Sequence, residues 1–438
     1  MITLIKTNFS KILFYLLSSS VFIGILLVTI NFEKISINVF NGYYMFNAQH
    51  NPYYQLLLAL IIFIFITYFI LRTGNKLYIN SWLIKVFVTL FVGALFEYLY
   101  FGLDQFSYAH NAIYYSDKYP MFKSGIGFVI RVNSFFTYIG GNSFYSLKII
   151  NTFVAFLSLV LFYKTYLHIL NKEINTDTHN ILVYGIFIMP TVLMWSSLIG
   201  KDSLILFPIS LFIYSFIKII DKPKVIYFIF IIISLLLAFY IRKFIPIIMI
   251  GTILIYNIKL NRNSLLILVG VSVLLFFLSK LVLGSNHQLS NYTNLFQMLG
   301  ELQKTFSRGG SAMEVHEIKN LFDYIFYFIP NFFTAMFLPL PFIGTSNMFL
   351  WFFAFENVIL LYLFVRYIVF NIKTILLNKY LRVLLIFIFC WSLIYVILSP
   401  GNLGTALRYK SQVLPILIVL ILLSKYFIDN KVRSNNAN

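Results

Sequence analysis

Long apolar runs separated by short polar segments dominate the pattern of the 438-residue chain. Each run holds about 17–25 residues, the length that an α-helix needs to cross roughly 30 Å of hydrocarbon. The runs are continuous, which does not fit the short alternating strands of a membrane β-barrel. The runs that this pattern predicts as membrane-spanning helices are 12–32, 55–71, 83–103, 147–170, 181–199, 203–220, 225–241, 244–260, 264–283, 348–370, 383–399 and 413–428.

The segment 321–347 differs from these runs because it mixes apolar residues with Pro330, Pro339, Pro341 and Gly344. Proline breaks helices, and irregular backbone at membrane depth is tolerated where protein or a watery cavity surrounds it. A single crossing here would place the basic loop 366–382 on the outer side, against the positive-inside rule. We therefore expect a re-entrant or twice-bent element. The predicted fold is an all-α polytopic membrane protein with about 12 transmembrane helices.

The short loops between the runs carry most of the Lys and Arg residues, which sets the predicted sidedness. Placing the N-terminus in the cytoplasm puts these basic loops on the cytoplasmic side, as the positive-inside rule requires. Two larger loops, 104–146 and 284–320, then lie outside, and residues 429–438 form a short cytoplasmic tail. We find no soluble domain or linker, so residues 1–438 are predicted to form one integral membrane domain with both termini cytoplasmic.

Composition supports this class. Hydrophobic residues make up 60% of the chain and charged residues 11%, against about 25% charged in soluble domains. The net charge of +19 is spread over short loops, so it reports topology and not a nucleic-acid surface. The single Cys390 excludes a disulfide framework, and the first run is too long for a cleaved signal peptide. The abundance of Ile, Phe, Tyr, Asn and Lys is typical of AT-rich bacterial genes.

One acidic residue is placed where this chain otherwise avoids charge. Asp104 follows the run 83–103 in the segment FGLDQFSYAHNAIYY and is one of only 14 Asp and Glu residues. A carboxylate at the mouth of a helix could activate an acceptor hydroxyl as general base, or hold a phosphate-bound metal. It could equally be a solvated loop acid or an interhelical hydrogen-bond partner. Glu97 and Glu356 lie inside apolar runs, where acids are costly and often functional.

Basic residues collect on the predicted outer side, where the positive-inside rule does not favour them. Two occupy very short turns: Lys201, followed by Asp202, and the pair Arg242–Lys243. They could bind phosphate, or simply snorkel and cap at the membrane surface. The segment PGNLGTALRYKSQ (400–412) follows glycines with Arg408 and Lys410, which would suit a pyrophosphate cradle. The loop 284–320 adds Arg308 before a Gly-Gly hinge. The chain has no Walker lysine, GxGxxG or GxSxG motif, so it carries no nucleotide-driven motor.

These motifs resemble two known families. An acid followed by a tyrosine in the first large outer loop, Asp104 and Tyr108, is similar to polytopic GT-C glycosyltransferases. The sequences WSSLIGKD, FIPNFFTAMFLPLPF followed by FAFEN, and NLGTALRYKSQVLPIL resemble Wzy-type polymerases of O-antigen or capsule repeat units. The resemblance implies polymerisation of undecaprenyl-pyrophosphate-linked oligosaccharides on the periplasmic face. The implied partners are this lipid-linked oligosaccharide, membrane lipid and a chain-length regulator protein.

The resemblance also implies roles for individual residues. Asp104 and Arg408 would be catalytic, Asp104 toward the acceptor hydroxyl and Arg408 toward the pyrophosphate. The residues expected to bind substrate are Lys201, Arg242, Lys243, Arg308, Lys410 and Tyr108. No cofactor is required and no metal ligand is assigned, although use of a divalent metal stays open. Two alternatives remain: a GT-C transferase that adds a single sugar, and a flippase or transporter for lipid-linked oligosaccharides.

Overall fold

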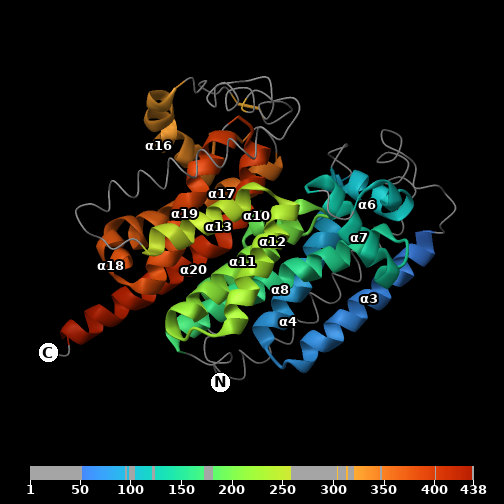
Figure 1. Ribbon diagram of the computed structural model, residues 1–438, viewed down its shortest axis with the longest axis horizontal. Coiled ribbons are helices and arrows are strands. Elements are labelled where there is room, and N and C mark those ends of the chain that lie inside the picture. Colours follow the sequence, from blue (N-terminus) through green and yellow to red (C-terminus); the bar gives the residue numbers. More distant parts are fainter. Residues whose placement is uncertain are drawn as a thin grey trace. The chain divides into compact units, whose positions relative to one another are not determined.

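The computed structural model describes residues 52–93, 96–97, 104–120, 124–171, 181–257, 303, 312–313, 320–345, 348–399 and 401–436 (Figure 1). Over these residues the chain is helical, and its extended pairing is limited to two isolated bridges, Ala312 with Asn402 and Leu340 with Ile343. The all-helical prediction is therefore confirmed for this part of the chain. The predicted runs 12–32 and 264–283, and most of the loop 284–320, lie outside the described residues.

Within the described residues, five helical segments are long and apolar enough to cross a membrane. They are Phe144–Leu170, Lys201–Asp221, Leu350–Leu377, Lys379–Val396 and Leu403–Asp429. Apolar helices of 10–17 residues, such as Val225–Ile241 and Phe244–Asn257, accompany them. The protein is thus a helical, membrane-embedded protein with several candidate spans.

The helices follow the apolar runs where no breaker interrupts them. α3 (Pro52–Arg72), α12 (Val225–Ile241) and α13 (Phe244–Asn257) match their predicted runs closely. The run 181–199 is instead divided into α9 (Ile181–Ile188) and α10 (Pro190–Trp195). The break falls before Pro190, which lacks the backbone N–H that a continuous helix would need.

By its internal packing the chain divides into two units. Unit 1 comprises Met1–Leu161 and Lys172–Ser210, and unit 2 comprises Phe162–Asn171 and Leu211–Asn438. Two helices, α8 (Phe144–Leu170) and α11 (Lys201–Asp221), contribute residues to both. The predicted single domain therefore contains two separately packed cores.

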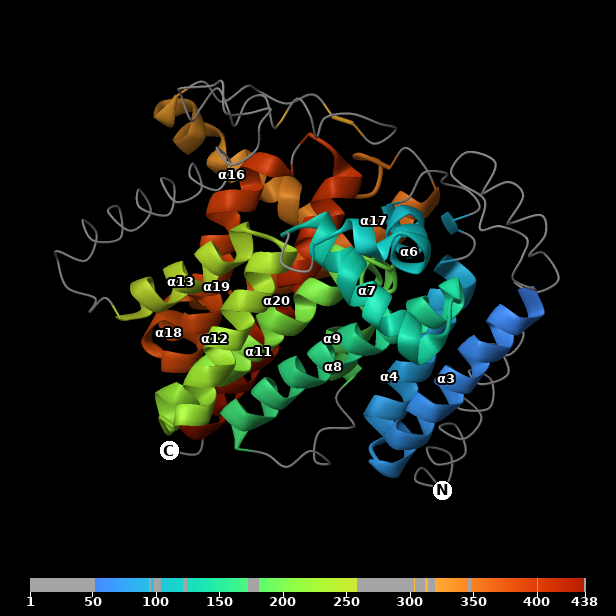
Figure 2. The ribbon, with the colours of Figure 1, turned by 45° about the vertical axis from the view of Figure 1, so that its right-hand side comes forward.

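The core of unit 1 is built on α4 (Lys76–Phe87), which packs against α3 and α9 and continues into the π-helical turn η1 (Val88–Val92) (Figure 2). Trp82 is fully buried, and its ring lies 5.8 Å from that of Phe153 and 5.4 Å from that of Phe156. The indole N–H donates to Thr67 Oγ1 at 2.9 Å. α3, α4 and α8 are thus joined around one aromatic side chain.

The predicted outer loop 104–146 is itself helical. It contains α6 (Asp104–Tyr114), the short 3₁₀ helix η2 (Ser116–Lys118) and α7 (Ile126–Gly140), and α6 packs against α7. Buried amides fix α7 to its neighbours: Asn151 Nδ2 on α8 donates to Asn133 Oδ1 at 2.6 Å. Asn151 Oδ1 in turn accepts from Ser203 Oγ on α11 at 3.3 Å.

In unit 2, α13 packs against α12 and α19 (Lys379–Leu398), and α19 packs against α20 (Leu403–Asn436), as Figure 1 shows. Aromatic contacts fill this core, with ring centroids of Phe212 and Phe387 6.2 Å apart. The 3₁₀ helix η3 (Val369–Asn371) and α18 (Ile372–Leu377) connect α17 (Met348–Tyr367) to α19.

The proline-rich segment 321–347 forms one helix and then a bend. α16 (Leu321–Phe337) begins at Asn320, whose side chain accepts from Asp323 N at 2.8 Å, and it runs through Pro330. α16 ends at Phe337, so the helix stops before Pro339 and Pro341. The expected breaking effect thus applies to Pro339 and Pro341 and not to Pro330.

The last predicted run, 413–428, lies within a longer helix, which begins before residue 413. α20 begins at Leu403, so Gly404, Arg408 and Lys410 lie within the helix. The physical reason is a good start signal: Asn402 Oδ1 accepts from Thr405 N at 3.0 Å and satisfies one of the free donors of the first turn.

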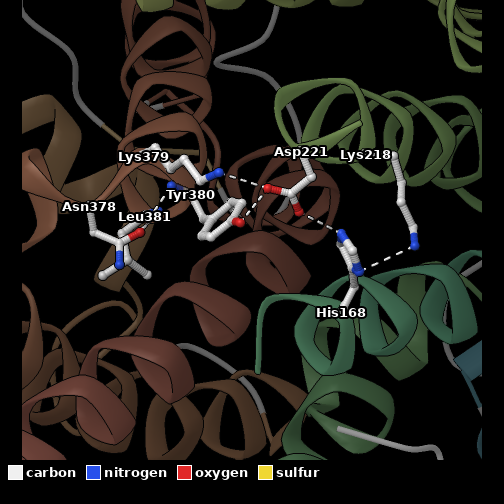
Figure 3. A network of polar contacts seen from close by, with 7 residues as sticks. All are labelled: His168, Lys218, Asp221, Asn378, Lys379, Tyr380 and Leu381. Atoms are coloured by element: carbon white, nitrogen blue, oxygen red, sulfur yellow. Dashed lines mark hydrogen bonds and ion pairs between the residues drawn. The ribbon is translucent and has the colours of Figure 1, made fainter. Parts of the chain in front are cut away.

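A polar cluster joins the C-terminal ends of α8 and α11 to the N-terminal end of α19 (Figure 3). Asp221 accepts from Lys379 Nζ at 2.8 Å and from the Tyr380 hydroxyl, and its other oxygen contacts His168 Nε2 at 2.8 Å. Lys218 Nζ lies 3.2 Å from His168 Nδ1, so Nε2 carries the ring proton toward Asp221. These three helix ends therefore meet within unit 2. Each adjoins a basic loop that the sequence predicts to lie on the cytoplasmic side.

Candidate functional site

In unit 1, Asp104 is the first residue of α6, and its side chain is exposed. A carboxylate is favoured at this position because helix N-termini carry a partial positive charge. The next residue, Gln105, is buried, and its Nε2 donates to Glu97 Oε1 at 2.7 Å. Gln105 thus holds the start of α6, and with it Asp104, beside the buried carboxylate of Glu97.

Glu97 is also paired with a buried cation. Lys148 Nζ on α8 donates to the same oxygen, Glu97 Oε1, and the two side chains are 0% and 2% exposed. Gly93 provides room for this contact, since a Cβ there would lie 3.0 Å from Lys148 Nζ. Because an unpaired buried charge is costly, the ammonium, the carboxylate and the amide hold one another in place.

The structure brings Tyr108 and the segment around Lys201 together. Gly200 has φ +148°, and a Cβ there would lie 2.9 Å from Tyr108 Cε2. Lys201, the first residue of α11, is half-buried, and its Nζ lies 3.9 Å from the position of a Cβ on Gly125. Asp104 precedes Tyr108 by four residues on α6, so both project from the same helix face. Three of the predicted site residues therefore gather in unit 1.

Tyr108 itself is 4% exposed, so it packs and does not offer a stacking surface for sugar. Tyr114 and Tyr115 at the end of α6 are exposed, and their rings lie 5.1 and 5.4 Å from that of His110. Burial lowers the pKa of His110 and raises the pKa of Tyr114 from their ordinary values. These rings form the aromatic surface nearest to Asp104 along α6.

In unit 2, Arg242 and Lys243 form the turn between α12 and α13. The guanidinium carbon of Arg242 lies 5.0 Å from the ring centroid of Tyr409 on α20, and that ring lies 4.6 Å from the ring of Tyr395. Arg408 directly precedes Tyr409 and is half-buried. Arg242 therefore lies against the N-terminal part of α20, the helix that also carries Arg408.

Lys410, which was expected to bind substrate on the outer side, lies instead in the interior of unit 2. Its side chain is fully buried, with Nζ 3.4 Å from Glu356 Oε1 and donating to Asn357 Oδ1. Asn357 Nδ2 donates to the carbonyl oxygen of Pro339 at 2.8 Å. Lys410 thus ties α20 to α17 and to the bend after α16, and its charge is used inside the fold.

A short part of the predicted outer loop 284–320 lies against the start of α20. Met313 N donates to the carbonyl oxygen of Gly401 at 2.9 Å, and Ala312 forms a bridge with Asn402. Arg308 lies outside the described residues. Over the described part of the chain, no three His, Cys, Asp or Glu side chains are grouped as metal ligands would be.

Sequence reasoning missed the partners of the buried charges. Glu97 and Glu356 were recognisable as acids inside apolar runs, but Lys148 and Asn357 were not assigned to them. Lys85 was also missed, a fully buried lysine on α4 that hydrogen-bonds Ser196 Oγ. A lysine inside an apolar run was the available signal in each case.

Comparison with family models, with curated proteins and with solved structures gave no match to this chain.

Proposed function

We propose that the protein polymerises undecaprenyl-pyrophosphate-linked oligosaccharide repeat units of a bacterial surface polysaccharide, an O-antigen or a capsule. The reaction would take place at the outer face of the inner membrane, with about 12 crossings and both termini in the cytoplasm. The partners would be the lipid-linked substrate, membrane lipid and a chain-length regulator. No cofactor is needed, because the pyrophosphate leaving group supplies the driving force.

The observation that supports this proposal is the contact of Arg242 with α20, the helix that carries Arg408. The guanidinium of Arg242 lies over the ring of Tyr409, the residue that follows Arg408 in the sequence, and Lys243 follows Arg242. A guanidinium presents a planar pair of donors that matches phosphate oxygens. Cations on contacting segments favour a pyrophosphate head group as ligand, and their charge would stabilise it as it leaves.

In unit 1, the proposed acceptor residue is Asp104, with Lys201 as a further phosphate contact. The acceptor hydroxyl oxygen would attack the anomeric carbon of the donor sugar. The bond between that carbon and the pyrophosphate oxygen would break, and the hydroxyl proton would pass to the Asp104 carboxylate. The lipid pyrophosphate would leave with its negative charge held by the arginines.

Substitution of Arg408 and Asp104 tests the proposal. We expect Arg408→Ala and Asp104→Ala each to reduce polymer by at least tenfold, since each removes one charge used in the transition state. Surface polysaccharide from a complemented deletion strain, separated on a gel, gives the measurement. Arg366→Ala and Asp117→Ala are matched controls, because Arg366 lies at the far end of α17 and Asp117 is fully exposed. Full-length ladders from properly inserted variants of both Arg408 and Asp104 would sink the proposal.

The gel of the deletion strain separates the alternatives. A polymerase leaves a single repeat unit on the acceptor when it is lost, whereas a single-sugar transferase leaves a shifted ladder. Complete loss of surface glycan would favour a flippase for lipid-linked oligosaccharides.

A further inference from the structure

Three lysine side chains are fully buried within the described part of the chain: Lys85, Lys148 and Lys410. Lys148 is paired with Glu97, and Lys410 is paired with Glu356. Lys85 has a different partner, because its Nζ contacts Ser196 Oγ and no described carboxylate lies within ion-pair distance. Lys85 thus differs from Lys148 and Lys410 in its partner, although all three side chains are equally buried.

An ammonium without a counter-ion is costly in such surroundings. Removing a single charge from water costs far more than one hydrogen bond to a hydroxyl returns, and buried groups respond by neutralising. A lysine does this by losing a proton. The two paired lysines have no such need, because a carboxylate balances each charge.

The groups around Lys85 suit either protonation state. Ser196 follows α10, and its hydroxyl also bonds the carbonyl oxygen of Val192. Thr89 Oγ1 donates to the carbonyl oxygen of Lys85 at 2.8 Å, and Ser81, one turn earlier on α4, is 1% exposed. The Ser81 hydroxyl has no hydrogen-bond partner in the described part of the structure. Hydroxyls both donate and accept, so they can serve an amine as well as an ammonium.

The neighbouring helices bring no described counter-charge to Lys85 Nζ. Besides Lys85, the titratable side chains that the structure describes on α4 and on the unit 1 elements packed against it are Lys76, Tyr78, Tyr68, Arg72, Tyr184, Tyr145 and Lys148. The carboxylate nearest along these elements, Glu97, is already engaged by Lys148 and Gln105.

We propose that Lys85 and Ser196 form a proton-binding site inside unit 1, with Lys85 held as a neutral amine in the folded protein at neutral pH. The ligand of this site is a proton, and its arrival places an uncompensated charge between α4 and the turn after α10. The site would therefore make the packing of these elements sensitive to pH. This inference is independent of the polymerase proposal.

Equilibrium unfolding of the full-length protein in detergent micelles tests it, for the wild type and for Lys85→Met between pH 7 and 9. Unfolding exposes Lys85 to water, where it takes up a proton, so rising pH opposes unfolding. Relative to Lys85→Met, the folded-to-unfolded ratio of the wild type should rise up to tenfold per pH unit. A ratio that does not change with pH would overturn the proposal.

Two further variants keep the test decisive. Lys148→Met is the matched control, because it removes a charged lysine and leaves Glu97 without its cation. At pH 7 it should lower stability much more than Lys85→Met does. Equal losses would mean that Lys85 is charged and paired with an acid elsewhere in the chain, which would contradict the proposal. Should Lys85→Met fail to fold, NMR of lysine labelled at Cε provides the same answer: the Lys85 signal, assigned through Ser196→Ala with Ser81→Ala as control, must be that of an amine at pH 7. An ammonium signal at pH 7 would refute the proposal.

Discussion

The two units each enclose one Lys–Glu pair together with one carboxamide, but they connect these groups in opposite ways. In unit 1 the carboxylate of Glu97 accepts from both Lys148 and Gln105. In unit 2 the ammonium of Lys410 contacts both Glu356 and Asn357. The shared atom is therefore an acceptor in one unit and a donor in the other.

This difference shows what each pair holds in place. The amide of Gln105 belongs to α6 and anchors the helix that begins with Asp104. The amide of Asn357 passes the contact on to the carbonyl oxygen of Pro339, at the bend that follows α16. A buried ion pair is weak evidence for stability, but breaking one is strongly destabilising. Unit 1 thus uses a buried charge to fix the helix that begins with Asp104, and unit 2 uses one to fix the bend after α16.

Removing the cation of unit 1 should have the largest effect. Lys148→Met leaves Glu97 buried without its counter-charge, and we expect a loss of about 3–5 kcal/mol in the free energy of unfolding. Denaturant unfolding of the purified full-length protein measures it. Adding Glu97→Gln should recover most of the loss. A double variant no more stable than Lys148→Met would show that the pair is not what stabilises this region.

The corresponding change in unit 2 should cost somewhat less. Lys410→Met strands Glu356, but the nitrogen–oxygen distance of that pair is 3.4 Å, so less direct contact is lost. We expect about 3 kcal/mol in the same unfolding measurement, with rescue by Glu356→Gln. Lys425→Met on the same helix serves as control and should be close to neutral. A loss of stability in Lys425→Met but not in Lys410→Met would contradict the assignment of Lys410 as the buried partner of Glu356.

The cluster of Figure 3 tests whether an ion pair must be buried to contribute strongly to stability, because the side chains of His168, Asp221 and Lys379 are 20% to 48% exposed. Asp221→Asn keeps the shape of the side chain and removes the charge that His168, Lys379 and Tyr380 contact. We expect a loss of about 1–2 kcal/mol, since water screens part of the interaction. Asp117→Asn should have no measurable effect, because the carboxylate that pairs with Arg131 is itself fully exposed. Equal losses of stability at both sites would mean that burial of the charge does not determine its contribution.

Removing an amide while keeping the ion pair should have the smallest effect. Gln105→Leu deletes one donor to Glu97 and leaves Lys148 in place, for an expected loss of about 1 kcal/mol. Its functional effect should be larger than its effect on stability, because the start of α6 loses its anchor. Polysaccharide gels and unfolding curves on the same variant compare the two. Asn357→Leu, which removes an acceptor instead, completes the comparison.

Much of the helical layout could be predicted from the sequence, because the length and continuity of apolar runs determine it. Val225–Ile241 and Phe244–Asn257 are examples in which hydrophobicity and a short polar turn are sufficient. α20 starts at Leu403, before the predicted run 413–428, because Asn402 supplies a local cap. Pro330 was expected to break a helix, but α16 continues through it.

The candidate site was harder to predict, since it depends on contacts between distant segments. That Arg242 lies against α20 follows from its stacking on Tyr409, which no local pattern encodes. Lys410 was expected to bind substrate because it is two residues from Arg408. Residues two positions apart on a helix do not share a face, and Lys410 points to Glu356 in the interior. From the sequence, Glu356 was recognisable only as an acid without a known partner.

The stacking of Arg242 on Tyr409 has a consequence for the order in which the protein is made. The turn that carries Arg242 is synthesised early, whereas Tyr409 belongs to α20, the last helix of the described chain. Chains emerge and fold from the N-terminus onward. The contact of Arg242 with α20 is therefore completed only when the final helix has been translated and inserted, so a nascent or truncated chain would lack it.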